Sequence, residues 1–92
     1  MIKIKRTGKF DQMLKGLVAE DEKLLSLTET KILLFAKNPT DTRVENHPLK
    51  RRLKGKWAFN ITNDVRIVYE WQGKNAVRFL AVGKHEKIYK RP

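Results

Sequence analysis

The stretch that decides the fold is residues 57–82, WAFNITNDVRIVYEWQGKNAVRFLAV. Within it, apolar side chains occupy every second position of three runs, at residues 57–61, 65–71 and 77–82. Residues typical of turns separate the runs, Thr-Asn-Asp at 62–64 and Gln-Gly-Lys-Asn at 72–75. Because these connections are short, the stretch predicts an antiparallel meander of three strands.

The alternation also predicts which side chains share a face of this sheet. We expect the core face to carry Trp57, Phe59, Ile61, Val65, Ile67, Tyr69, Trp71, Val77, Phe79 and Ala81. The other face would carry Asn60, Arg66 and Arg78, with Asp64 in the turn, and would be largely open to solvent. Such a cationic face is well suited to RNA.

The chain before the meander predicts a short strand and two helices. Ile2 and Ile4 alternate with lysines, and Thr7 is placed to cap a helix whose apolar positions, from Phe10 to Val18, follow helical spacing. A second helix should begin near the acidic residues 20–22 and end near Lys37, because Asn38-Pro39 cannot continue it. Residues 38–54 are predicted to be irregular, and Gly83 to end the last strand.

Together these elements predict a single α+β domain spanning residues 1–92. Its order is a short N-terminal strand, an antiparallel two-helix hairpin and a three-stranded antiparallel meander. Two helices can cover only one face of such a sheet, so we expect both to pack on the same side.

Charge is the strongest indication of function. Twenty-one Lys and Arg against ten Asp and Glu give a net charge of +11. The excess lies in the second half, where residues 47–92 contain twelve basic and three acidic residues. This imbalance favours a polyanionic partner, for which nucleic acid is the usual candidate. The alternative, a merely solvated surface, normally mixes the two signs.

Several classes of protein are excluded or disfavoured. Without cysteine the chain has neither disulfides nor thiolate metal sites, which fits a cytoplasmic location. The N-terminus lacks the apolar run of a secretory signal, and no run is long enough to span a membrane. Two histidines with no supporting spacing do not indicate a metal site, and no motif indicates a nucleotide or other cofactor.

Metal-free RNA cleavage requires a base for the ribose 2′-hydroxyl, an acid for the leaving oxygen and cations near the phosphate. The chain contains candidates for each requirement. They are His47 and His85 as proton carriers, Asp64 and Arg66 on one face of a strand, Asn60 on the neighbouring strand, and Tyr89 beyond His85. Candidates for contact with RNA and the ribosome are Lys50, Arg51, Arg52, Lys54, Lys56, Arg78, Lys84 and Lys87.

Each candidate also has a purely structural interpretation. His47 is placed to cap backbone groups in a turn before Pro48, and His85 to be a solvated surface residue. Asp64 is placed to form the turn, and Arg66 to pair with Glu70 or Asp64. Tyr89 has an apolar ring that can pack on the sheet edge. Trp57 and Trp71 follow the apolar alternation, which favours a place in the core.

The segment from Asn46 to Tyr89, NHPLKRRLKGKWAFNITNDVRIVYEWQGKNAVRFLAVGKHEKIY, resembles the RelE/ParE toxin superfamily, and within it the YafQ-type RelE branch. Three elements carry the resemblance, in the same order and at fitting distances. They are His-Pro-Leu followed by a basic Leu-Lys-Gly, the hairpin Asp-x-Arg-Ile-x-Tyr, and the closing Gly-x-His-x-x-Ile-Tyr. The first half matches in its pattern of helices, so the resemblance covers nearly the whole chain.

The resemblance implies a toxin of a type II toxin–antitoxin system that cleaves mRNA in the ribosomal A site without a metal. Its partners would be mRNA, the ribosome and a cognate acidic antitoxin. By position, His47, Asp64, Arg66, His85 and Tyr89 match site residues of the family. Asn60 departs from it, since relatives have histidine or arginine there.

Two other functions remain open. A ParE-like protein shares the fold but inhibits DNA gyrase without nuclease chemistry, and the histidines with Asp64 and Arg66 argue against it. A catalytically silent domain that binds RNA or the ribosome is the third interpretation, favoured only by Asn60.

Overall fold

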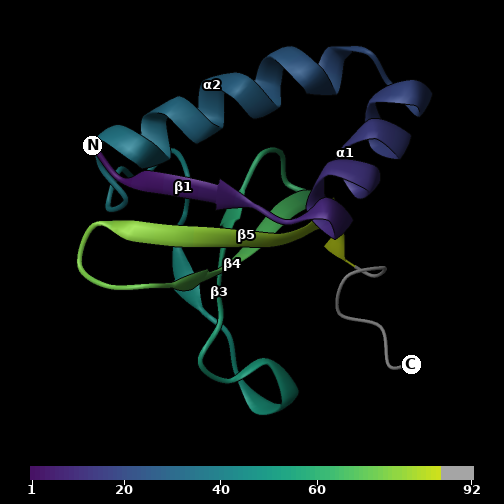
Figure 1. Ribbon diagram of the computed structural model, residues 1–92. Coiled ribbons are helices and arrows are strands. Elements are labelled where there is room, and N and C mark those ends of the chain that lie inside the picture. The colour runs from purple at the N-terminus through teal and green to yellow at the C-terminus, as the bar shows by residue number, and fades with distance from the viewer. Residues whose placement is uncertain (86–92) are drawn as a thin grey trace.

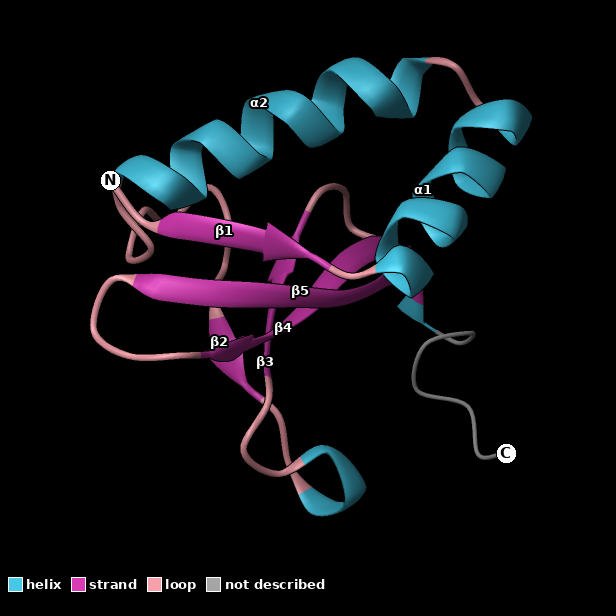
Figure 2. Ribbon diagram, in the orientation of Figure 1, coloured by secondary structure: helices cyan, strands magenta, loops and turns pink. Residues whose placement is uncertain are grey.

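The computed structural model describes residues 1–85, which form two layers, a sheet and a pair of helices on one of its faces (Figures 1 and 2). The five-stranded sheet has the order β1-β5-β4-β3-β2. Its strands are β1 (Lys3–Arg6), β2 (His47–Pro48), β3 (Trp57–Asn60), β4 (Val65–Trp71) and β5 (Ala76–Lys84). The predicted antiparallel meander is confirmed as β3, β4 and β5, while β1 pairs with β5 in parallel.

Helices α1 (Gly8–Glu20) and α2 (Lys23–Lys37) lie over the same face of the sheet, as predicted (Figure 1). Thr7 caps α1, because its hydroxyl oxygen accepts a hydrogen bond from the Phe10 N–H at 3.1 Å. The second helix ends at Lys37, as expected from the following Asn38-Pro39. None of the helices in residues 1–85 is long and apolar enough to cross a membrane.

Aromatic rings form the centre of the core between the two layers. Phe35 of α2 is fully buried and stacks on Phe59 of β3, with ring centroids 4.4 Å apart. Tyr69 of β4 meets the same phenylalanine edge-on at 4.9 Å. Trp57 and Trp71 are partly buried and pack against this core, so their apolar interpretation is confirmed. The alternation of β3 and β4 therefore predicted the core face correctly.

The core prediction was wrong at the end of β5. Phe79 pairs with Tyr69, but Val68 pairs with Ala81, so Leu80 is an extra residue without a partner on β4. Such a β-bulge reverses the alternation of faces beyond it. Val82 accordingly belongs to the buried core, whereas Ala81 lies on the opposite face. The strand also continues through Gly83, which pairs with Arg66, to Lys84.

The face away from the helices is less open than predicted. Ala58 and Val68 are buried there, and Asn60 is only 7% exposed. Glu45 and Arg66 hydrogen-bond to Asn60, and the segment between β2 and β3, which contains a short 3-10 helix, η1 (Arg51–Leu53), lies beside Val68. Together with Val68, Leu80 and Ala81 of the sheet, Leu53 and Lys56 of this segment line a groove.

Residues 38–54 were predicted to be irregular, and this prediction was wrong in part, because the segment contains both β2 and η1. A strand of two residues is too short to show an alternation, and its second residue is Pro48. Proline is tolerated here because β2 is an edge strand, so one side of it needs no backbone donor. The pairing of His47 with Ala58 of β3 is thus set by the tertiary structure.

The stacked position of Phe35 makes it the most sensitive residue of α2. We expect Phe35→Ala to lower the free energy of unfolding by about 3–5 kcal/mol, because it removes a fully buried ring and leaves a cavity. Leu33 on the same helix is 49% exposed, and Leu33→Ala should change stability by about 0.5 kcal/mol or less. Urea unfolding of both variants measures the difference. Equal losses would contradict this description of the core.

Candidate active site on the sheet face away from the helices

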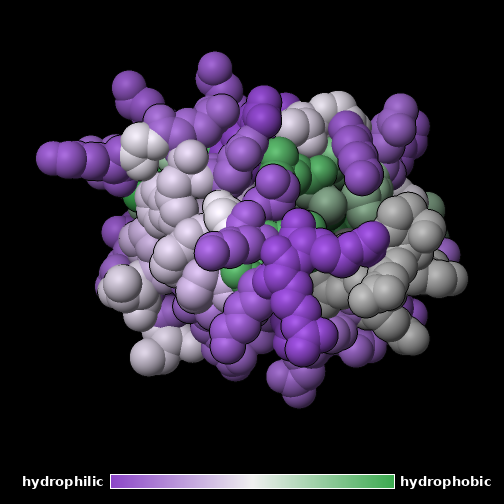
Figure 3. All heavy atoms as spheres, turned by 90° about the horizontal axis from the view of Figure 1, so that it is seen from below, coloured by the Kyte–Doolittle hydropathy of each residue, from purple (hydrophilic) through white to green (hydrophobic). Residues whose placement is uncertain are grey.

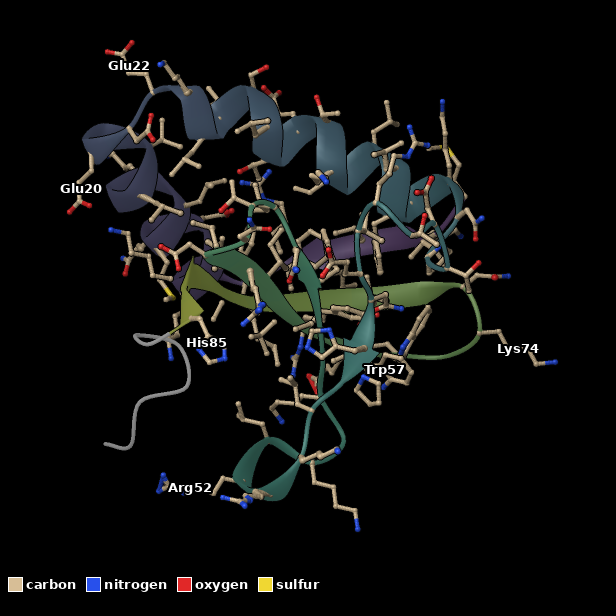
Figure 4. All side chains as sticks on the ribbon, turned by 180° about the vertical axis from the view of Figure 1, so that it is seen from behind. Glu20, Glu22, Arg52, Trp57, Lys74 and His85 are labelled. Atoms are coloured by element: carbon tan, nitrogen blue, oxygen red, sulfur yellow. The ribbon has the colours of Figure 1, made fainter. Side chains whose placement is uncertain are left out.

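Three neighbouring strands bring the predicted site residues together. Asn60 at the end of β3 pairs with Arg66 of β4, and Arg66 pairs in turn with Gly83 of β5. Cross-strand partners present their side chains on the same face, here the face away from the helices. His85 follows two residues after Gly83. Figure 4 shows His85 at the end of β5, on the side of the sheet away from α2.

Asp64 and His85 lie next to each other where β4 begins and β5 ends. The backbone N–H of His85 donates to the Asp64 carbonyl oxygen at 2.8 Å. The Thr62 hydroxyl accepts hydrogen bonds from the N–H groups of Asp64 and Val65, which forms the turn. Asp64 is exposed, so its position in the turn leaves the carboxylate accessible. The turn interpretation and the functional one are thus compatible at this residue.

Arg66 is oriented by Asn60. Its Nε donates to the Asn60 side-chain oxygen at 2.8 Å, and the Asn60 amide nitrogen donates to the Glu45 carboxylate at 2.9 Å. Within residues 1–85, Arg66 forms no salt bridge with either expected partner, Glu70 or Asp64, and Glu70 pairs with Arg78 instead. The amide therefore separates a guanidinium from a carboxylate and hydrogen-bonds to both.

His47 stands on the edge strand β2, half-buried, opposite Ala58. Ala58 shares its face with Asn60 two residues later, which places His47 on the same face of the sheet. The imidazole Nδ1 lies 2.8 Å from the carbonyl oxygen of Glu45, so the predicted contact with the backbone is present. Next to it, Asn46 accepts a hydrogen bond from the Tyr69 hydroxyl at 2.5 Å. Burial raises the pKa of that hydroxyl, which keeps it a donor.

Glu45 contacts two of the candidate site residues, and nothing in the sequence indicated it. Its carboxylate contacts Asn60 and its carbonyl contacts His47, although it belongs to a segment predicted to be irregular. Asp41 stabilises the turn just before Glu45, because its carboxylate accepts hydrogen bonds from the backbone N–H and the guanidinium of Arg43. The Arg43 hydrogen bonds lower the pKa of Asp41 to about 2. No motif or periodicity marks Glu45, so only the folded chain identifies it.

The basic run from Lys50 to Lys56 projects from the sheet on the loop that carries η1. Figure 4 places Arg52 near the tip of this loop, far from Glu20 and Glu22 at the turn between the helices. Seen from the side of this loop, the surface is mainly hydrophilic (Figure 3). Salt bridges in residues 1–85 involve Arg6, Arg43 and Arg78, and none involves the run. Its positive charge is therefore not neutralised by any described carboxylate.

The remaining predicted residues lie elsewhere. Arg78 shares the face of Arg66 but is paired with Glu70. Lys84 lines a pocket against Met13 and Leu17 of α1, on the helical side of the sheet. Tyr89 and Lys87 lie outside the described residues. Within the described part of the chain, no group of three or more His, Asp or Glu side chains is arranged to hold a metal ion.

Comparison with known proteins identifies the fold and the family. A sequence search of curated proteins gave no match. The structure superposes on YafQ from E. coli strain BL21(DE3) with a TM-score of 0.79 and 21% identity, covering 97% of this chain and 99% of that one. A metal-bound toxin from Helicobacter pylori matches with a TM-score of 0.70 and 29% identity, over 97% and 100% of the chains. YafQ in the E. coli DinJ-YafQ complex gives 0.69 and 23%, over 97% and 99%.

The sequence itself matches the family described as the bacterial toxin of type II toxin-antitoxin system, YafQ, over residues 2–90. Since that match spans nearly the whole chain, the protein belongs to the YafQ family of type II toxins.

Proposed function

We propose that this toxin is an endoribonuclease that cleaves mRNA in the ribosomal A site and so inhibits translation. The observation that carries the proposal is the pairing of β3, β4 and β5, which places Asn60 and Arg66 on one sheet face and brings His85 to Asp64, through a backbone hydrogen bond, at the end of the same strands. An un-neutralised basic loop projects from the same side of the molecule. Chemistry and phosphate binding are therefore adjacent.

The proposed reaction uses the message's own ribose as the nucleophile. A base takes the proton of the 2′-hydroxyl, the oxygen attacks the adjacent phosphorus, and the 5′-oxygen leaves with a proton from an acid. The products carry a 2′,3′-cyclic phosphate and a 5′-hydroxyl. Arg66 would stabilise the charge that grows on the phosphate, a role that a guanidinium can fill without a metal.

The amide of Asn60 limits which side chains can act as the general acid and the general base. A neutral amide hydrogen-bonds but does not exchange protons near neutral pH, so His47, His85 and the Asp64 carboxylate are left for this task. His85 is our choice for general acid–base catalysis, because it lies beside Asp64 at the open end of the sheet. Tyr89 would complete the site by stacking on a base or donating a hydrogen bond.

The proposed substrate complex is held mainly by charge. Lys50, Arg51, Arg52, Lys54 and Lys56 would contact the phosphates of mRNA or ribosomal RNA, with Lys87 farther along the chain, whereas Lys84 lies on the helical side and would contribute less. Arg78 would contribute less, because Glu70 already neutralises it. These contacts release counterions from the RNA, so affinity should fall steeply as salt rises.

A cognate antitoxin is the proposed regulator, as the crystal structure of the E. coli DinJ-YafQ complex supports. An acidic protein that covered the basic loop and the sheet face would block the substrate and the site together. The toxin itself would act in the cytoplasm, where translating ribosomes are found.

Primer extension on a defined message during in-vitro translation tests the proposed function. Wild-type toxin should produce cuts in register with the reading frame, and only when ribosomes translate. His85→Ala should lower the cleavage rate by roughly 10²–10⁴-fold, as expected for a lost acid–base group. Lys74→Ala in the far turn of the meander is the control, and it should cleave like the wild type (Figure 4).

Other outcomes identify other functions. An intact message combined with blocked DNA supercoiling would replace the proposal with a gyrase inhibitor. An intact message on ribosomes that retain the protein would indicate a silent binding domain. Wild-type cleavage by the His85 variant would remove that residue from the mechanism.

The salt dependence of binding tests the role of the basic loop. Arg52→Ala and Lys54→Ala should each weaken ribosome binding and reduce the slope of log affinity against log salt by about 1. Lys15 on α1 is an exposed cation of the helical layer, so Lys15→Ala removes the same charge from another part of the surface. Affinity measured over a salt series compares the three. A common slope for all variants and the wild type would show that the loop makes no phosphate contacts.

A further inference from the structure

Glu45 has an unusual backbone conformation for its residue type. Its φ angle is +51°, in the left-handed region that glycine prefers and that other side chains rarely adopt. Residues held in this way are often found where the surrounding structure needs a particular geometry. At Glu45 the conformation directs the carbonyl to His47 and the carboxylate to Asn60.

The carbonyl of Glu45 determines the tautomer of His47. A carbonyl oxygen only accepts hydrogen bonds, so the 2.8 Å contact requires a proton on Nδ1 of the imidazole. When neutral, this imidazole therefore has its lone pair on Nε2. Free histidine prefers the opposite tautomer, so the contact selects the form in which Nε2 can accept a proton.

The carboxylate of Glu45 determines the orientation of Asn60. A carboxylate accepts and the Arg66 Nε donates, so the amide must direct its nitrogen to Glu45 and its oxygen to Arg66. Asn60 is 7% exposed and has little room to turn over. With Nε engaged, the two terminal nitrogens of the guanidinium remain for an anionic group. Glu45 thus acts on Arg66 through one intervening side chain.

We propose that Glu45 is a positioning residue of the active site, which sets the His47 tautomer through its carbonyl and aims Arg66 through Asn60. The inference rests on the proposed nuclease function and names a residue that serves it without touching the substrate. It also gives Asn60 a task for which an amide is suited, since only a group with both a donor and an acceptor can link Glu45 to Arg66.

A set of variants separates positioning from folding. Glu45→Ala and Glu45→Gly both remove the carboxylate, but glycine also relieves the left-handed backbone and should give the more stable protein. Glu45→Gln keeps an oxygen that can accept from Asn60. We expect the alanine and glycine variants to lose roughly 10- to 100-fold in kcat with little change in KM, and glutamine to retain most activity. If kcat follows the stability of the variants in urea, and not the presence of a side-chain oxygen at position 45 that accepts from Asn60, the proposal is overturned.

A double-mutant cycle tests the route through Asn60. If the carboxylate acts through this amide, Glu45→Ala should lower kcat in the wild-type background but have no further effect beside Asn60→Ala. Independent, multiplying losses would overturn the proposed route. Far-UV circular dichroism and urea unfolding verify that each variant is folded. If Asn60→Ala does not fold, the comparison of Glu45→Gln with Glu45→Ala still tests the proposal.

The tautomer is measured without any nuclease assay. Long-range proton–nitrogen correlation spectra of the wild-type toxin, recorded where His47 is neutral, should assign the proton to Nδ1. A proton on Nε2 would overturn this half of the proposal even if the toxin cleaves mRNA. Conversely, an Nδ1 proton in a toxin that leaves mRNA whole would reject the nuclease function while keeping the geometry around Glu45.

Discussion

The register of β3, β4 and β5 is the constraint on which the site depends. It sets Asn60 opposite Arg66 and Arg66 opposite Gly83, and the unpaired Leu80 makes this alignment possible. Without that extra residue, the strict alternation that puts Val77 and Phe79 in the core would also direct positions 83 and 85 toward the helices. The bulge buries Val82 in their place and leaves His85 beside Asp64, on the face of Arg66. One unpaired residue, Leu80, therefore allows β5 to contribute to the core on one face and to the candidate site on the other.

The two faces of the sheet differ in character, since one carries the core and the other carries the candidate site. Stacked and edge-on aromatic contacts around Phe35 hold the helices to one face. On the other face lie the Arg66–Asn60–Glu45 chain, two histidines and a basic loop whose positive charge no described carboxylate neutralises. Self-repulsion among these cations opposes folding, and the aromatic core supplies the stability that tolerates it. An acidic partner would relieve the same repulsion.

The spacing of apolar residues predicted the regular elements of the fold. The meander, both helices, the Thr7 cap and the end of α2 at Lys37 followed from spacing and from residue type. The exchange of Ala81 for Val82 in the core did not, because Leu80 resembles any strand residue until its partner is known. Strand β2 and the loop that carries η1 were not predicted for a similar reason, since a strand of two residues is too short to show an alternation. Motifs predicted His47, Asp64, Arg66 and His85 as site residues, whereas Glu45 became a candidate only through its contacts in the folded chain.

The central claim is that these residues activate a ribose hydroxyl of the message, and its most direct test alters that hydroxyl alone. A message carrying a single 2′-deoxynucleotide on the 5′ side of a mapped cut is translated with the wild-type toxin, beside the all-ribose message. We expect the altered bond to stay intact while cuts at other positions continue, because no nucleophile remains at that phosphate. Cleavage at the deoxy position at an undiminished rate would contradict the account and would require water or another group as the nucleophile.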